Sequence, residues 1–262
     1  GNFAINDVEF KIDGFDARLS VKDRDAILVR ADIAPTAVGL PLPLMTGCRP
    51  SLEGQGCNYQ AVPVLPTALG PLKIERGYTA VQVAINGKPY RIFGTHLEVR
   101  QIVPGPLGEP TRVLQRLQAL ELAMTATAMA MATPGTETLV IGDINSARED
   151  GFGTIATPVG PLPPPYSIFA DVYGFTDAWT KQPAAPRGKG APLKANTCCQ
   201  AEDLANARSA LYERIDIIFS LNAEIKVPDA KLLGESIGDK TLPRAFGVWP
   251  SDHASVAARI QY

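Results

Sequence analysis

The chain has 262 residues, of which 45% are hydrophobic, and a formal net charge of -2. This length can bury one large core or two small ones. The charge balance does not indicate a strongly basic nucleic-acid-binding protein, although a local basic patch is compatible with it. The most apolar stretch, residues 119–132, is too short to cross a bilayer and favours a buried helix.

The first quarter of the chain predicts one strand and one long loop. Residues 25–30 place four apolar residues between charged ones, which favours a strand. Residues 35–71 are rich in proline and glycine and have weak periodicity, so they indicate an extended surface loop. Loops of this length are usually functional or mobile.

The best-defined hairpin follows this loop. Residues 79–85 alternate between apolar and polar types, Asn86-Gly87 is a strong turn signal, and residues 90–93 form the returning strand. The second strand of the hairpin therefore brings His96 to an edge of the sheet.

A helix and a short strand occupy the centre of the chain. Residues 110–132 are rich in Leu, Ala, Gln and Met, with apolar residues three and four apart, and a Pro-Gly pair ends the pattern. Residues 138–141 form a short apolar strand. It stops at a glycine, where the chain turns and exposes Asp143 and Asn145.

The C-terminal half adds two loops and two strands. Residues 158–165 are rich in proline and residues 187–190 form a small basic loop, whereas residues 214–219 and 254–260 favour strands. We find no repeat and no linker that divides the sequence. Strands interspersed with few helices predict one domain, residues 1–262, built as a layered α/β sandwich.

The four cysteines bear on the compartment. Residues 1–10 have neither the basic start nor the apolar core of a signal peptide, so the chain is mature, trimmed or intracellular. Cys48 and Cys57 flank a glycine-containing loop, Cys198 and Cys199 are adjacent, and the spacing of a zinc site is absent. We favour disulfides in a secreted or periplasmic protein, with Cys48–Cys57 as the simplest of three pairings; four reduced thiols without a role are the alternative.

Four short polar motifs close the predicted strands and supply two imidazoles, three aspartate carboxylates and an amide. This set can hold a divalent cation, activate water and receive an anionic transition state. The motifs are Gly94-Thr95-His96-Leu97-Glu98, Gly142-Asp143-Ile144-Asn145, Arg214-Ile215-Asp216-Ile217-Ile218-Phe219 and Ser251-Asp252-His253.

Two of these motifs have clear structural interpretations beside the functional one. Asp143 and Asn145 face the same side if the segment is extended, but an Asx turn after a strand uses the same residue types. Asp216 lies among apolar neighbours, where an unpaired carboxylate is costly. A salt bridge to Arg214 or another cation and the orientation of an imidazole, as in catalytic triads, are both open.

The two histidine motifs also have structural alternatives. Asp252 and His253 face opposite ways on an extended strand, so a bend is needed for both to reach one site, and a strand-initiating turn is the structural alternative. His96 alone is compatible with an ordinary core or surface histidine. The four motifs are without function only if all of these alternatives hold at once.

At these four motifs the chain resembles the endonuclease/exonuclease/phosphatase family, which includes deoxyribonuclease-I-like nucleases, sphingomyelinases and inositol-polyphosphate phosphatases. Thr-His-Leu, Gly-Asp-x-Asn, Arg-Ile-Asp-x-Ile-Phe and Ser-Asp-His match in identity and order. Arg76-Gly77 and residues 175–179 match weaker family features. The resemblance runs from about residue 23 to the C-terminus.

The resemblance implies a fold and a cofactor. The fold is a four-layer α/β/β/α sandwich of two mostly antiparallel sheets flanked by helices. The cofactor is Mg²⁺, or Mn²⁺ or Ca²⁺, because hard cations prefer oxygen ligands. Asp252 would lie in or near the metal shell, together with Asp143.

The resemblance also implies catalytic and substrate-binding roles. His253 would be the general acid/base, held by Asp216. Asp143 would orient or deprotonate the attacking water. Asn145 and His96 would contact the scissile phosphate.

One departure concerns the N-terminal family motifs, an Asn on the first strand and a Gln-Glu pair whose Glu is a principal metal ligand. Asn2 and Asn6 lie in no convincing strand, and Glu75 and Glu98 occupy other family positions. We consider an N-terminally incomplete chain, a site that uses another carboxylate, and a degenerate relative without catalysis. Missing N-terminal strands would expose an edge or a core face and favour self-association.

We therefore predict a metal-dependent phosphoester hydrolase, in the first place a phosphodiesterase acting on nucleic acid or a lipid headgroup. The lack of basic charge counts against nucleic acid. The lack of a plain aromatic hairpin counts against a lipid surface, unless residues 35–71 contain one. The alternative is a binding or assembly protein that kept the fold and lost turnover, and a carboxylate opposite Asp143 distinguishes the two.

Overall fold

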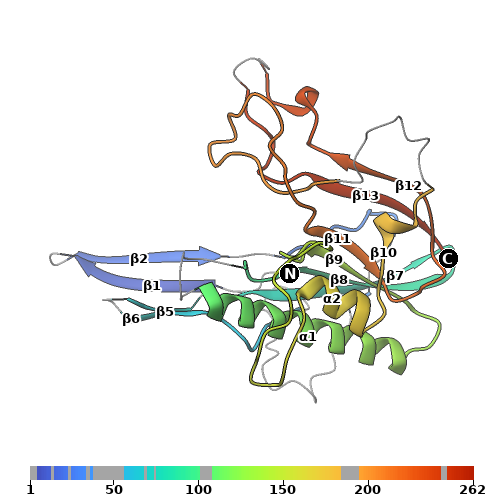
Figure 1. Cartoon of the computed structure of the whole chain (residues 1–262), viewed down its shortest axis with the longest axis horizontal. Coiled ribbons are helices and arrows are strands. Elements are labelled where there is room, and N and C mark those ends of the chain that lie inside the picture. Colours follow the sequence, from blue (N-terminus) through green and yellow to red (C-terminus); the bar gives the residue numbers. More distant parts are fainter. Residues whose placement is uncertain are drawn as a thin grey trace.

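A computed structural model describes residues 5–12, 15–22, 25–33, 36–37, 56–67, 70–73, 75–100, 108–183, 195–242 and 247–262. Within them, a seven-stranded mixed sheet forms the centre of the molecule. Helices cover one face and a two-stranded ribbon lies over the other (Figure 1). The predicted α/β sandwich is confirmed, and the described residues supply three of its layers.

The central sheet has the strand order β10-β11-β9-β8-β7-β3, and β4 also pairs with β7. Only the β8–β9 pair is parallel among these described ladders. The strands are β3 (Thr36–Ala37), β4 (Gly56–Asn58), β7 (Gly77–Ile85), β8 (Lys88–His96), β9 (Glu137–Asp143), β10 (Thr176–Asp177) and β11 (Asp216–Ser220).

Three further strand pairs and several helices complete the described structure. The pairs are β1 (Ile5–Ile12) with β2 (Phe15–Lys22), β5 (Val64–Thr67) with β6 (Gly70–Lys73), and β12 (Lys226–Leu233) with β13 (Ser255–Gln261). The helices are α1 (Gly108–Ala132), α2 (Pro165–Ser167), the π-helix η1 (Ile168–Val172), and the 3₁₀ helices η2 (Ala178–Lys181) and η3 (Ile237–Asp239).

The predicted hairpin is confirmed as β7 and β8. Asn86 and Gly87 both have positive φ, 52° and 79°. A two-residue turn with two positive φ angles matches the right-handed twist of the strands that it joins. The chain then crosses over through α1 and returns as β9, parallel to β8, so that both strands end at the same edge of the sheet.

The main core lies between α1 and the helix-covered face of the sheet. The predicted helix is confirmed, and its apolar stripe is fully buried at Ala119, Leu122 and Ala126. Phe93 and Phe219 meet it from the sheet. Alternation along the strands sends these aromatic residues to one face and leaves their neighbours for the other.

The ribbon of β12 and β13 packs on the opposite face, over β11. Its small cluster joins Ile218 of β11 to Ile225, Val227 and Ala258. Tyr262 contacts the ring of Tyr90 as well. This packing holds the segment immediately before β13, which contains His253, above the start of β11.

Two local predictions are wrong. Residues 25–30 join no sheet: the segment is extended and irregular, Leu28 is 95% exposed, and Ile27 lies against Gly94, where an added Cβ would come within 3.1 Å of it. The predicted loop at residues 35–71 contains β3, β4 and β5, because short strands with proline and glycine give little periodicity.

The remaining predictions concern Asn6, two segments outside the described residues, and membrane-spanning helices. Asn6 lies within β1, contrary to our expectation. The loop at residues 187–190 and residues 38–55 lie outside the described residues. None of the described helices combines the length and apolar character needed to cross a membrane.

Candidate catalytic site

Three polar residues meet where neighbouring strands end. His96 closes β8, Asp143 closes β9 and Asp216 opens β11. In the ladder, His96 pairs with Asp143, and Asp143 pairs with Asp216. Directly opposed residues place their side chains on the same face, so the three project together toward the β12–β13 side.

A glycine permits the close approach of β8 and β9 at this edge. Gly142 has φ of 138°, and a Cβ there would lie 1.9 Å from the carbonyl oxygen of Thr95. No side chain fits, and the positive φ is strained for other residues. Gly142 thereby brings Asp143 beside His96, whose Nε2 lies 3.4 Å from Oδ2 of Asp143.

The turn after β9 is the Asx turn that we held open as the structural alternative. Oδ1 of Asp143 accepts a hydrogen bond from the backbone N–H of Asn145 at 2.7 Å. Asn145 has φ of 51°, so the segment is not extended, and the expected common side for the two side chains is wrong. Nδ2 of the buried Asn145 donates to the carbonyl oxygen of Leu97 at 2.8 Å. The turn uses one oxygen of Asp143 and leaves the other directed toward His96.

The second histidine meets the second carboxylate. Nδ1 of His253 lies 2.8 Å from Oδ2 of Asp216. The required bend is present at Asp252, and Oγ of Ser251 accepts a hydrogen bond from the backbone N–H of His253 at 3.1 Å. Arg214 pairs with Asp177, so the predicted alternative of an Arg214–Asp216 salt bridge is wrong.

The surroundings raise the pKa values of two residues in this cluster, an acid and a base. Burial, reinforced by the charge of Asp216, raises the pKa of Asp143 to about 7; the Asn145 N–H, His253 and Arg76 act against this rise. The hydrogen bond to Asp216 raises the pKa of His253 to about 9, against the effect of burial. At neutral pH, His253 therefore carries a proton that it can give, and Asp143 stands near its midpoint.

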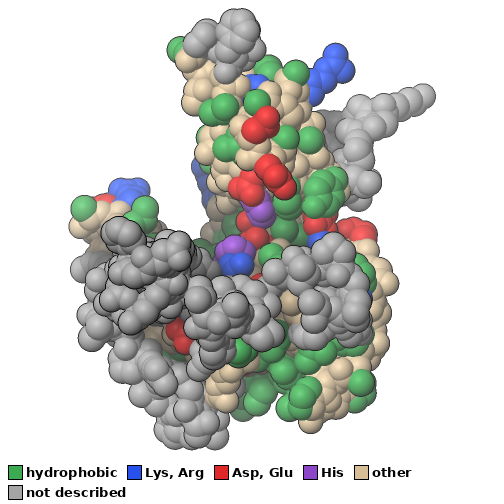
Figure 2. Space-filling model, turned by 90° about the vertical axis from the view of Figure 1, so that its left-hand side faces the viewer, with side chains coloured by type: hydrophobic (Ala, Val, Ile, Leu, Met, Phe, Trp, Pro, Cys, Tyr) green, Lys and Arg blue, Asp and Glu red, His purple; other side chains and the backbone are tan. Residues whose placement is uncertain are grey.

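A cavity of about 350 Å³ opens beside these residues. Its polar lining includes Asp25, Thr95, Asp216, Ser251 and His253. Figure 2 shows histidine and acidic side chains gathered in the hollow between the upper and lower parts of this face. The volume is that of a small-molecule site. Sequence analysis missed Asp25, since it lies at the start of an apolar run that was interpreted only as a strand.

The acidic part of the cluster fits a hard divalent cation. Ligand atoms of Asp143, Asp216 and His253 all lie within 4.8 Å of one another. The two carboxylates raise the cost of each other's charge, and a cation between them would remove that cost. Asp252 does not join this group in the described part of the chain; its carboxylate is exposed and accepts a hydrogen bond from Oγ of Ser251.

Thr197 is a further residue that sequence analysis missed. It is fully buried, and its Oγ1 accepts hydrogen bonds from the backbone N–H groups of Ile215 and Asp216, each at 3.1 Å. Its carbonyl oxygen accepts from Ala254 at 2.8 Å. Thr197 thus ties the start of β11 to the residue after His253. A lone threonine in a loop gives no sequence signal for this role.

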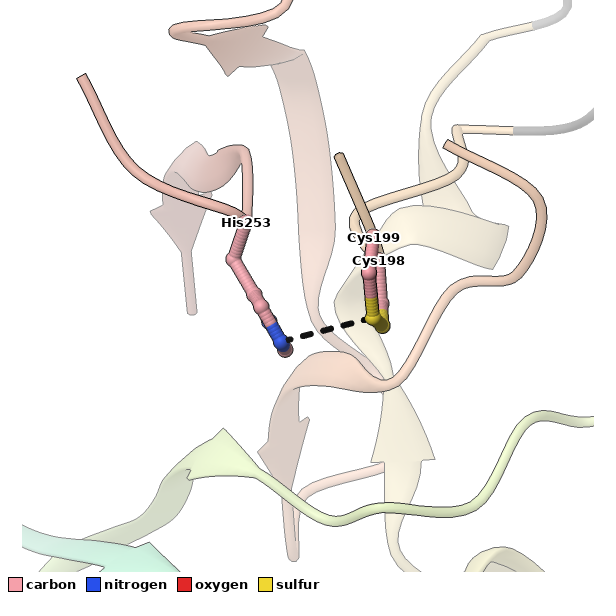
Figure 3. A group of neighbouring side chains, drawn as sticks. All are labelled: Cys198, Cys199 and His253. Carbon is pink, nitrogen blue, oxygen red and sulfur yellow. Dashed lines mark hydrogen bonds between the residues drawn. A yellow bond between two sulfur atoms is a disulfide. The ribbon is translucent and has the colours of Figure 1, made fainter. Parts of the chain in front are cut away.

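The adjacent cysteines lie next to His253 in space. Their sulfur atoms are in bonding contact, and Sγ of Cys199 is 3.9 Å from Nε2 of His253 (Figure 3). The sequence showed no histidine near this pair because His253 is 54 positions away. Cys48 lies outside the described residues, so the Cys48–Cys57 pairing stays a prediction.

Comparison with protein-family models and with curated proteins gave no match. Several solved structures resemble the chain. A mannosyl-6-phosphatase of Bacteroides thetaiotaomicron is 14% identical, with 72% of this chain and 58% of that chain covered and a TM-score of 0.49. An endonuclease/exonuclease/phosphatase family protein of the same organism is 15% identical (71% and 53% covered, TM-score 0.46). The human Nocturnin catalytic domain with bound sulfate is 18% identical (79% and 58% covered, TM-score 0.45).

The chain thus spans little more than half of the length of these three structures. The resemblance does not identify the reaction or the substrate, which depend on the side chains of this chain.

Proposed function

We propose that the chain is a metal-dependent phosphoester hydrolase. The supporting observation is the convergence of four motifs, 157 positions apart at their extremes (His96 to His253), on one cavity edge. His96, Asp143 and Asp216 come from adjacent strands, and His253 comes from the opposite layer. Structural turns alone give no reason for both histidines to meet carboxylates there.

Asp143 and Asp216 would hold the cation, Mg²⁺ or alternatively Mn²⁺ or Ca²⁺, through carboxylate oxygens. Such a cation polarises a phosphoryl oxygen and lowers the pKa of water. Asp143 offers an oxygen that orients the attacking water and accepts its proton. Asp252 keeps the lesser role of an exposed charge near His253, whose pKa it helps to raise.

His253 supplies the general acid in this proposal. Asp216 holds the Nδ1 proton, which fixes the ring and stabilises its charged form. The Nε2 proton is then available to the leaving oxygen of the phosphoester. The raised pKa of His253 keeps this proton in place through neutral pH.

His96 and Asn145 are proposed to contact the phosphate. The ring of His96 is partly exposed beside Asp143. Asn145 uses one amide N–H on the carbonyl oxygen of Leu97, and an amide nitrogen carries a second N–H. Both contacts would stabilise charge on the phosphoryl oxygens as the transition state forms.

For the substrate we propose a phosphodiester of nucleic acid or of a lipid headgroup. Export and self-association also stay proposals. Asp25 lines the same cavity as Asp216 and His253 and adds a further carboxylate to it, which favours a working metal site over a binding protein that has lost turnover.

The test is a hydrolysis panel of DNA, RNA, sphingomyelin and an inositol phosphate, run with Mg²⁺ and with a chelator. We expect at least one substrate to be cleaved, cleavage to stop in chelator and to return with Mg²⁺. Asp216→Asn, checked for folding by circular dichroism, is the matched inactive control. Folded protein that cleaves none of the four with Mg²⁺, Mn²⁺ or Ca²⁺ would support the binding or assembly protein instead.

A further inference from the structure

Beside the acidic cluster lies a second group of possible metal-ligand atoms, two of which are sulfur atoms. Cys198, Cys199 and His253 each place one ligand atom within 4.8 Å of the others. Figure 3 shows both sulfur atoms facing the imidazole. The hydrolysis proposed above uses His253 and leaves both cysteines without a role.

Backbone hydrogen bonds on two sides hold the cysteines against His253. The N–H of Cys198 donates to the carbonyl oxygen of Glu213 at 3.0 Å, and its own carbonyl oxygen accepts from Tyr212 at 2.6 Å. On the other side, the N–H of Gln200 donates to the carbonyl oxygen of Asp252 at 2.8 Å. The cysteine segment thus bridges the chain entering β11 and the chain entering β13, so the backbone of both cysteines is held beside the ring.

The imidazole is oriented as a metal-ligating histidine is. Its Nδ1 faces the carboxylate of Asp216 at 2.8 Å, so its Nε2 is the nitrogen turned toward Cys199. A carboxylate on one ring nitrogen raises the basicity of the other and fixes its direction. The 3.9 Å from Nε2 to Sγ of Cys199 is close to the separation of about 3.6 Å expected for a sulfur and a nitrogen that share a tetrahedral zinc ion.

We propose that Cys198, Cys199 and Nε2 of His253 form, in the reduced protein, a binding site for a soft divalent cation of the Zn²⁺ type. Each thiol loses its proton to solvent on binding, and no electron is transferred. Both sulfurs must be thiolates, so a disulfide between them closes the site. Cys199 is half-buried and the exposed Tyr212 lies against its sulfur at 3.9 Å, which leaves an approach from solvent.

The consequence is competition for one imidazole. Thiolates select soft cations, whereas the carboxylates of Asp143 and Asp216 select hard ones. A cation on the sulfur side occupies the nitrogen from which the proton would leave in hydrolysis. This inhibitory effect, unlike the binding itself, rests on the proposed function.

The binding test uses Co²⁺ as a spectroscopic probe on the full chain after reduction. Thiolate ligands give Co²⁺ an intense near-ultraviolet absorption that oxygen and nitrogen ligands do not give. We expect this absorption to saturate at one equivalent and to disappear when Zn²⁺ is added. Cys198→Ser/Cys199→Ser should abolish it, and Cys48→Ser/Cys57→Ser, the matched control, should retain it. Asp216→Asn should weaken Co²⁺ binding about 10-fold to 100-fold, since it removes the carboxylate behind the ligating ring.

Three results would overturn the site. These are no thiolate absorption from protein whose thiols are shown to be free, equal absorption in the Cys198/Cys199 double variant, or loss of absorption only in the Cys48/Cys57 variant. If the double variant does not fold, Cys199→Ala and alkylation of the folded wild type provide the same comparison.

Activity then separates the two proposals. With Mg²⁺ present, Zn²⁺ should lower hydrolysis by the reduced wild type at least tenfold and leave the Cys198→Ser/Cys199→Ser variant unaffected. Co²⁺ binding without any hydrolysis would reject the proposed function and keep the site. Hydrolysis without thiolate absorption would reject the site and keep the function.

Discussion

Two buried carboxyl groups in this molecule have the same raised pKa, about 7, in very different surroundings. One is Asp143, at the edge where β8, β9 and β11 meet the cavity. The other is Glu121, on the buried face of α1. Burial is the largest cause for both, so a raised pKa by itself does not distinguish a functional site from a core position.

Their neighbours make the distinction. The carboxylate of Glu121 accepts a hydrogen bond from the backbone N–H of Gln60 at 3.1 Å, and neither His96 nor His253 is among the causes of its raised pKa. Asp143 faces His96 at 3.4 Å and has Asp216 and His253 within ligand distance. Like charges and imidazoles in mutual contact therefore distinguish the candidate site, while desolvation alone is a cost of burial.

The largest effect should come from removing the imidazole of His253, which Asp216 holds. His253→Ala removes the acid and leaves Asp216 without its partner. We expect kcat on the best substrate of the panel to fall about 10⁴-fold, the upper range for acid–base catalysis, with the far-ultraviolet spectrum unchanged. Turnover within tenfold of wild type would place the acid elsewhere.

A direct test compares variants of the two carboxyl groups whose pKa values are raised. Asp143→Asn should lower kcat about 10³-fold because it removes the oxygen that holds the cation and orients water. Glu121→Gln should leave kcat within about twofold, since Glu121 lies in the core under the sheet. Equal losses in both variants would show that burial of a carboxyl, and not its place in the cluster, explains the result.

The raised pKa of Glu121 also makes its contribution to stability depend on pH. The pKa of Glu121 rises from 4.5 to about 7 on folding, so the folded protein keeps a proton that the unfolded chain loses. Stability should therefore fall as pH rises from about 4.5 to about 7 and then stay level, by about 3 kcal/mol in all. Glu121→Gln should remove this part of the pH dependence. Urea unfolding of both proteins at pH 4 and pH 8 measures it, and parallel curves would contradict the assignment.

The elements of the core were easier to predict from the sequence than the contacts of the site. The turn residues Asn86-Gly87 and the spacing along α1 are local signals, and both elements formed as predicted. The pairing of His253 with Asp216 was implied by the family resemblance of the motifs, although the bend at Asp252 had to be assumed.

What the sequence did not reveal depends on contacts between distant segments. Asp25 reaches the cavity because its segment joins no sheet, and Cys199 meets His253 only because residues 195–200 bridge two strand entries. Asn145 was expected on an extended segment, but its own backbone N–H closes a turn on Asp143. Local pattern contains no information on the first two contacts, because each is decided by a partner far along the chain. The turn at Asn145 is local, and the Asx pattern had offered it as the structural alternative.

The smallest expected effect tests whether the site depends on support from outside the four motifs. Thr197→Val keeps the shape of a fully buried side chain and removes the acceptor for the N–H groups of Ile215 and Asp216. Two N–H groups lose their partner, so we expect about 2 kcal/mol less stability. Because Asp216 then loses part of its positioning, kcat should fall about tenfold with KM unchanged. Thr197→Ser keeps the hydroxyl and should restore both values; if it behaves like the valine variant, packing of the methyl group and not the hydrogen bonds holds this edge of the site.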